Sequence, residues 1–162
     1  MSLRDRIQTD VTAAMRSGDA LRRDVLRMAQ NAVYTVEKRD RRELSDDEVV
    51  GVLTREVKTR RESVEAFRKG GREDLAAKEE AEIAILGGYL PEQIDDAAIE
   101  ALVEEAIAAT GAQNARDLGK VMGWLSPKTR GRADGKRVAE LVASALARAD
   151  LAGHDARPHE AG

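Results

Sequence analysis

The amino-acid sequence predicts an all-α fold, and three observations lead to that prediction. The 162 residues include only three prolines, and the dominant Ala, Leu, Val, Glu and Arg favour helices over a β sandwich. Apolar residues recur at the helical spacing i, i+3, i+4 and i+7 along most of the chain. Capping residues precede most of these repeats, and glycines follow them.

Four helices are predicted before Leu90, each with one apolar stripe for burial. Two of them begin with a capping box, in which a serine is followed three residues later by an acid. We expect the third and fourth helices to lie antiparallel, because two consecutive glycines separate them. The predicted helices run from Ser2 to Gly18, from Asp19 to about Lys38, from Ser45 to Gly70, and from about Arg72 to Tyr89.

A domain boundary is predicted at Leu90-Pro91, because proline breaks the fourth helix. We assign residues 1–93 to an N-terminal helical domain of about four helices and residues 94–148 to a small three-helix bundle. Residues 149–162 have no periodic stripe, so we expect a disordered tail there. The bundle helices are predicted from Asp95 to Gly111, from Leu118 to Leu125, and from Asp134 to about Arg148, with Ser126-Pro127 ending the second.

The composition argues against several classes of chemistry. The chain has no cysteine, so disulfides, thiolate nucleophiles and thiolate metal sites are excluded. Both histidines, His154 and His159, fall in the predicted tail, and phosphate-loop and dinucleotide motifs are absent. We therefore predict no catalytic residue, no metal and no cofactor. No apolar run is long enough to cross a membrane, and we expect a cytoplasmic protein without membrane partners.

One stretch, Gly119 to Val138, is strongly basic in a chain whose net charge is −3. The helix predicted to start after Asp134 adds free N–H groups and a dipole that favour anions, which makes a phosphate site plausible. We expect four glycines here to permit close approach of a ligand, with Gly131 at positive φ. The candidate nucleic-acid-binding residues are Lys120, Trp124, Lys128, Arg130, Arg132, Lys136 and Arg137, and the glycines are Gly119, Gly123, Gly131 and Gly135.

Simpler interpretations compete with this one. A basic loop is often only a solvated helix connection, and Trp124 also suits the edge of a bundle. Adjacent charges such as Glu79-Glu80 and Arg60-Arg61 are expected on solvated helix faces. The alternative function is a helical protein-interaction module, in which Trp124 and the Gly119/Gly123 face dock a partner helix without RNA.

An ordered set of motifs resembles a known family. Leu90-Pro-Glu-Gln is followed by Gly-Lys-Val-Met-Gly from Gly119, a proline, and Gly-Arg-Ala-Asp-Gly-Lys from Gly131. This order resembles the YqeY-type proteins of the GatB/YqeY family over Met1 to about Arg148. Those proteins are similar to the C-terminal tail domain of the B subunit of the glutamyl/aspartyl-tRNA amidotransferase. Where the family has a small residue after Val-Met-Gly, this chain has Trp124.

The resemblance implies an accessory role in tRNA handling. The amidotransferase is a carbon-nitrogen ligase with glutamine as amido-N-donor, but its catalytic centres belong to other domains and subunits. The resemblance therefore implies tRNA as a partner, and amidotransferase or aminoacyl-tRNA synthetase components as further partners. It leaves open whether this chain takes part in catalysis.

Overall fold

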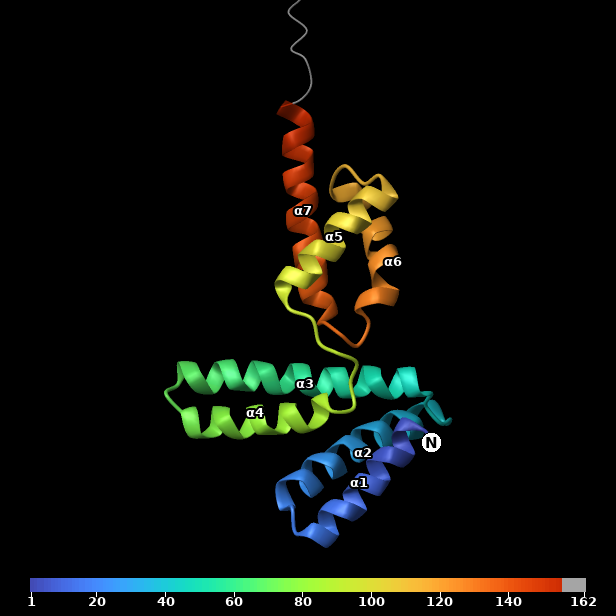
Figure 1. Ribbon diagram of the computed structural model, residues 1–162, viewed down its shortest axis with the longest axis vertical. Coiled ribbons are helices and arrows are strands. Elements are labelled where there is room, and N and C mark those ends of the chain that lie inside the picture. Colours follow the sequence, from blue (N-terminus) through green and yellow to red (C-terminus); the bar gives the residue numbers. More distant parts are fainter. Residues whose placement is uncertain (156–162) are drawn as a thin grey trace, which may run out of the picture. The chain divides into compact units, whose positions relative to one another are not determined.

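The computed structural model describes residues 1–155, and that part of the chain is helical without any strand (Figure 1). This confirms the predicted all-α class. The chain divides into two compact units, one of Met1–Pro91 and one beginning at Glu92. The elements are α1 (Leu3–Ser17), α2 (Ala20–Asp40), α3 (Asp46–Lys69), α4 (Glu73–Gly87), α5 (Asp96–Thr110), the 3₁₀ helix η1 (Ala115–Asp117), α6 (Leu118–Thr129) and α7 (Gly135–Asp155).

Local capping determines where the N-terminal helices begin. The Ser2 side chain accepts a hydrogen bond from the Asp5 N–H, and the Asp5 side chain accepts one from the Ser2 N–H, which completes the predicted capping box. Ser45 and Glu48 form the same arrangement at α3. Gly18 ends α1 in the left-handed conformation, with φ of 76°. These short-range predictions are confirmed.

The N-terminal unit consists of two helical hairpins, α1 with α2 and α3 with α4 (Figure 1). α2 packs against both helices of the second hairpin, and α1 packs against α3. Ile7, Leu26, Leu53 and Leu86, one from each helix, are almost completely buried where the hairpins meet. Burial of such side chains stabilises the fold by about 1.5–3 kcal/mol each.

A buried ion pair joins α3 to α4 and corrects one expectation. Arg60 is 5% exposed, and its Nε donates to Glu82, itself 8% exposed, over 3.1 Å. A second nitrogen of Arg60 donates to Glu56 over 2.9 Å. We expected Arg60 on a solvated face, but it lies on the side of α3 that faces α4, where partners replace water.

In the C-terminal unit, α5, α6 and α7 each pack against the other two. Their apolar stripes meet in one core that includes Ile99, Val121, Leu125, Val142 and Leu146, all nearly inaccessible to solvent. In the described residues no helix is long and apolar enough to cross a membrane.

Two predicted helix ends are wrong. α6 continues past Pro127 to Thr129, because a proline in the last turn removes one hydrogen bond while the Arg130 N–H still reaches the Ser126 carbonyl over 3.0 Å. α7 continues past Arg148 to Asp155, so residues 149–155 are helical and include His154. The rest of the predicted tail, with His159, lies outside the described residues.

Candidate nucleic-acid interface

The turn between α6 and α7 is fastened by Arg132. Its guanidinium donates to the Lys128 carbonyl over 3.0 Å and to the Glu92 carbonyl over 3.3 Å. The Ile94 N–H in turn donates to the Arg132 carbonyl over 3.0 Å. Arg132 therefore holds the turn against residues 92–94. Its guanidinium is hydrogen-bonded to backbone oxygens of its own unit.

Gly131 is the residue that lets the chain reverse here. It has the predicted positive φ, 74°, and its carbonyl accepts a hydrogen bond from the Gln93 side chain over 2.7 Å. A left-handed conformation costs little only for glycine, so a larger residue would strain this turn.

Arg137 is engaged in ion pairs rather than presented to solvent alone. Its guanidinium makes two hydrogen bonds to Asp96 of α5, at 3.1 and 2.5 Å, and one to Glu140 at 3.2 Å. The Asp96 hydrogen bond is the main cause that raises the pKa of Arg137, and the same bond lowers the pKa of Asp96. No sequence spacing indicates this pairing, since the two residues are 41 positions apart.

The N-terminus of α7 is occupied by the chain's own acid. The Asp134 carboxylate accepts the Lys136 N–H over 3.2 Å, and its carbonyl accepts the Val138 N–H. Asp134 is therefore the predicted cap. Its negative charge also lies at the helix end where we predicted an external phosphate, so one of the free N–H groups there already has an acceptor within the chain. The phosphate site at this helix end stays a prediction.

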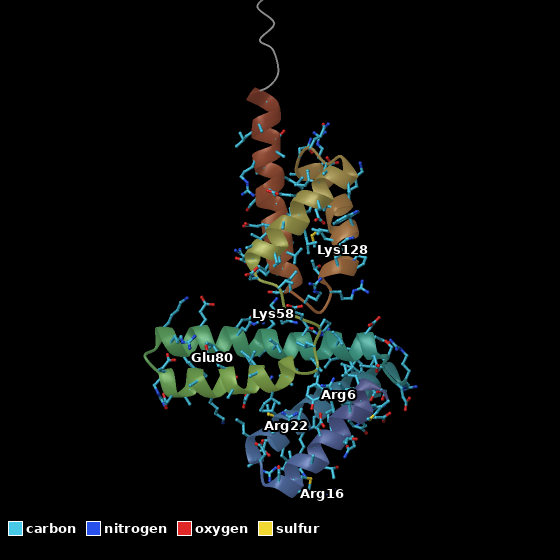
Figure 2. The ribbon with its side chains drawn as sticks, viewed as in Figure 1. Arg6, Arg16, Arg22, Lys58, Glu80 and Lys128 are labelled. Carbon is cyan, nitrogen blue, oxygen red and sulfur yellow. The ribbon has the colours of Figure 1, made fainter. Side chains whose placement is uncertain are left out.

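Four of the predicted cations remain on the surface: Lys120, Lys128, Arg130 and Lys136 are all exposed. Within residues 1–155 none of the four forms an ion pair with a carboxylate. Arg130 reaches the hydroxyl of Ser126 at 3.4 Å, and the Lys128 ammonium, marked in Figure 2, lies 4.0 Å from the centre of the Trp124 ring. The predicted set of six cations thus separates into four available charges and two engaged ones.

Trp124, Gly119 and Gly123 lie on α6 together with Lys120 and Lys128. Trp124 is partly buried against the C-terminal core and partly exposed. Gly119 and Gly123 are exposed, and no atom lies within 4 Å of the position that a Cβ would take on either. Gly135 is equally open at the start of α7. The outer side of α6 therefore combines bare backbone, one aromatic ring and lysines.

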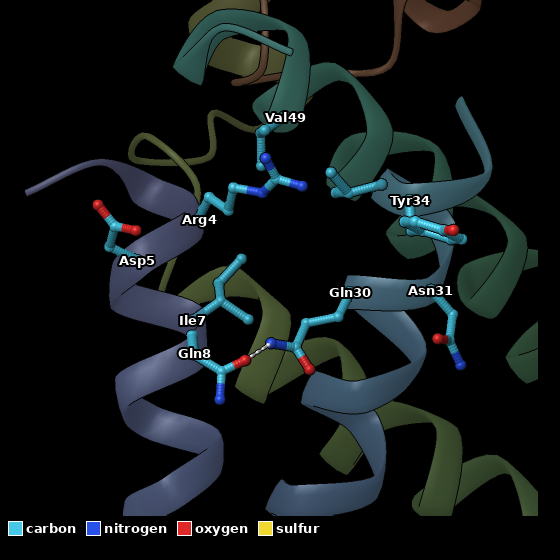
Figure 3. Close-up of a pocket in the computed structure, with 9 residues that line it drawn as sticks. Arg4, Asp5, Ile7, Gln8, Gln30, Asn31, Tyr34 and Val49 are labelled. Carbon is cyan, nitrogen blue, oxygen red and sulfur yellow. Dashed lines mark hydrogen bonds between the residues drawn. The ribbon is translucent and has the colours of Figure 1, made fainter. Parts of the chain in front are cut away.

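Elsewhere, the N-terminal unit has a pocket of about 400 Å³ lined by polar and apolar residues of α1 and α2 and by Val49 of α3 (Figure 3). The Gln30 amide donates to the Gln8 amide across it over 2.6 Å. Arg4 also lines the pocket, but its guanidinium is paired with Glu37 and Glu43. Nothing in this lining holds a nucleophile against a base. Within residues 1–155 no group of three or more His, Cys, Asp or Glu side chains is placed to hold a metal ion.

The fold and this surface define a two-unit helical protein whose C-terminal bundle carries four exposed cations on α6, the following turn and the start of α7. Comparison with known families is specific: the family model described as Yqey-like protein matches residues 4–146. The chain therefore belongs to the Yqey-like protein family.

Two curated proteins are similar to this chain in sequence. A protein of Pyrenophora tritici-repentis named "Altered inheritance of mitochondria protein 41, mitochondrial" is 30% identical over 130 residues, which cover 79% of this chain and 71% of the relative. An uncharacterized protein of Schizosaccharomyces pombe is 46% identical over 48 residues, covering 30% of this chain and 39% of that protein.

Proposed function

We propose that this Yqey-like protein binds tRNA as an accessory factor, through the exposed cations Lys120, Lys128, Arg130 and Lys136. The observation that carries the proposal is their exposure on one stretch of the C-terminal unit, without an ion pair to a carboxylate in the described residues, in a chain of net charge −3. Lys128, Arg130 and Lys136 lie at or next to the turn between α6 and α7, and Lys120 lies in the first turn of α6. Bulk attraction does not explain RNA binding by an acidic protein, so a local set of charges must supply it.

We infer that the RNA is tRNA from the motifs that resemble the tail domain of the amidotransferase B subunit. On this proposal the protein works beside the amidotransferase or aminoacyl-tRNA synthetases in the cytoplasm. The carbon-nitrogen ligase activity of that enzyme class belongs to other domains and subunits of the enzyme, and we assign none to this chain. The mitochondrial location in one relative's name belongs to that relative.

The alternative is a protein-interaction module that uses the bare Gly119/Gly123 face and Trp124. The open space beside both glycines favours close approach of some partner backbone. It does not require that partner to be RNA, so the experiment has to separate the two functions.

Titration with tRNA at a series of salt concentrations tests the proposal. Four phosphate contacts predict a log-log slope of roughly −2.8 to −3.6, since each contributes about 0.7–0.9. Changing both Lys128→Ala and Arg130→Ala should weaken binding and make the slope shallower by about 1.4–1.8. Arg55→Ala with Arg61→Ala is the matched control, because these two arginines of α3 are exposed and the change in charge is the same.

Equal losses in the two double variants would mean that the attraction is diffuse. Absence of tRNA binding at low salt would overturn the proposal and leave the protein-interaction module. Arg132 and Arg60 are unsuitable for this test, because one braces the turn and the other is buried in an ion pair.

A further inference from the structure

Trp124 is the single tryptophan of the chain, and its ring is held from two sides. Part of the residue packs against the C-terminal core. The Lys128 ammonium lies 4.0 Å from the ring centre, one helical turn further along α6. The side chain of Lys128 is itself exposed, so it can move away from the ring while the ring stays packed against the core.

The surroundings of the ring are open and cationic. Gly123 precedes Trp124 and is exposed, with no atom within 4 Å of a Cβ position. Lys120 lies one turn before the ring, and Arg130 follows Lys128 at the end of α6. A flat ring bordered by bare backbone and cations matches a nucleotide, which has a flat base and an anionic phosphate.

We propose that Trp124 stacks on one unpaired base of the RNA, and that Lys128 moves from the ring to the phosphate of that nucleotide. This inference rests on the proposed RNA binding and specifies an unpaired nucleotide as the ligand of this site. A base inside a duplex already has neighbours on both faces, so only an unpaired base in a loop or single strand can use the ring.

Replacing the contact of Lys128 with the ring by a stacked base is favourable, because stacking is the stronger of the two interactions. An exposed cation–π contact contributes a factor of about 2–5 to an equilibrium constant. Stacking of a base on an aromatic side chain contributes a factor of about 5–150. The base therefore displaces the ammonium, and the released Lys128 gains a phosphate contact instead of losing its partner.

Because Trp124 is the single tryptophan, the intrinsic fluorescence of the full-length protein reports on this site. A single-stranded adenine-rich RNA oligonucleotide should quench this fluorescence on binding, whereas a blunt RNA duplex should bind with little quenching. Binding of both RNAs without quenching would overturn the stacking and leave RNA binding intact. Failure of either RNA to bind at low salt would overturn the proposed function as well.

Variants separate stacking from charge. Trp124→Leu should lower affinity for the single strand about 5- to 150-fold while changing duplex affinity less than about 2-fold. Trp124→Phe, which keeps a ring, should recover most of that loss. Equal losses on both RNAs would contradict stacking. If circular dichroism shows that Trp124→Leu does not fold, the wild-type quenching and the Trp124→Phe variant decide.

Lys128→Met tests the movement of the lysine. It removes the ammonium and keeps an apolar stem, so quenching by the single strand should persist while the salt slope becomes shallower by about 0.7. An unchanged slope would show that Lys128 does not reach the phosphate and would overturn the exchange.

Discussion

Arg60 and Glu82 form a buried ion pair that joins the two helices of the α3–α4 hairpin, with 3.1 Å between Nε and the carboxylate. Removal of the arginine alone leaves a carboxylate in a site shielded from water. Arg60→Ala should therefore lower the free energy of unfolding by about 3–5 kcal/mol, measured by urea denaturation with circular dichroism.

Two further variants control that result. Arg61→Ala removes the neighbouring exposed arginine and should change stability by less than about 0.5 kcal/mol. Replacing both partners, Arg60→Leu with Glu82→Leu, should recover most of the loss, because an apolar pair needs no compensation. A stable Arg60→Ala protein would show that the pair contributes little.

Arg41 ends α2 in the left-handed conformation, with φ of 55°, which is less favourable for arginine than for glycine. Arg41→Gly should therefore raise the free energy of unfolding by about 0.5–1 kcal/mol. Arg41→Ala is the control for loss of the charge and should bring no gain. A stability gain of the same size in both variants would assign the effect to the charge instead.

Gly123 lies inside α6 with open space around it. Gly123→Ala should stabilise the protein by about 0.5–1 kcal/mol, because glycine is unfavourable within a helix. Gly123→Leu should leave the melting temperature intact but reduce tRNA binding, since its side chain would project from the bare face. A large fall in melting temperature in either variant would show that this face is packed.

Tyr89 is 4% exposed, and its hydroxyl donates to Asp10 and accepts from Arg22, while Arg6 lies over the ring. Burial, followed by the Asp10 interaction, raises the pKa of Tyr89 from 10.0 to about 12. The unfolded chain therefore loses this proton first, and stability should fall as the pH rises from about 10 to about 12.

Tyr89→Phe isolates this contribution. Melting temperatures measured across that pH range should fall less steeply in the variant than in the wild type. Identical pH profiles would mean that Tyr89 ionises as easily in the folded protein as in the unfolded chain.

The features that the sequence predicted correctly depend on residues close together along the chain. Ser2, Ser45 and Asp95 act as caps through groups three residues away, and Gly18 and Gly111 end helices through their own backbone conformation. Such interactions are complete within one helical turn. They therefore appear in the sequence as fixed spacings.

What could not be predicted depended on residues far apart. Arg60 resembles any exposed arginine until α4 is placed beside it, and Arg137 resembles a free cation until Asp96 is found 41 residues away. The end of α6 was wrongly predicted at Pro127 for a different reason. The rule that proline stops a helix carries little weight in a final turn, where few hydrogen bonds remain to be lost.

Arg132 bears on which substitutions this turn tolerates. Its guanidinium reaches two carbonyl oxygens at once, those of Lys128 and Glu92, and a lysine ammonium lacks the rigid fork that such bracing uses. In the proposed RNA binding, by contrast, Arg130 only needs to present positive charge. Among relatives, lysine and arginine should thus interchange freely at the position of Arg130, whereas the position of Arg132 should keep its arginine even where the local charge varies.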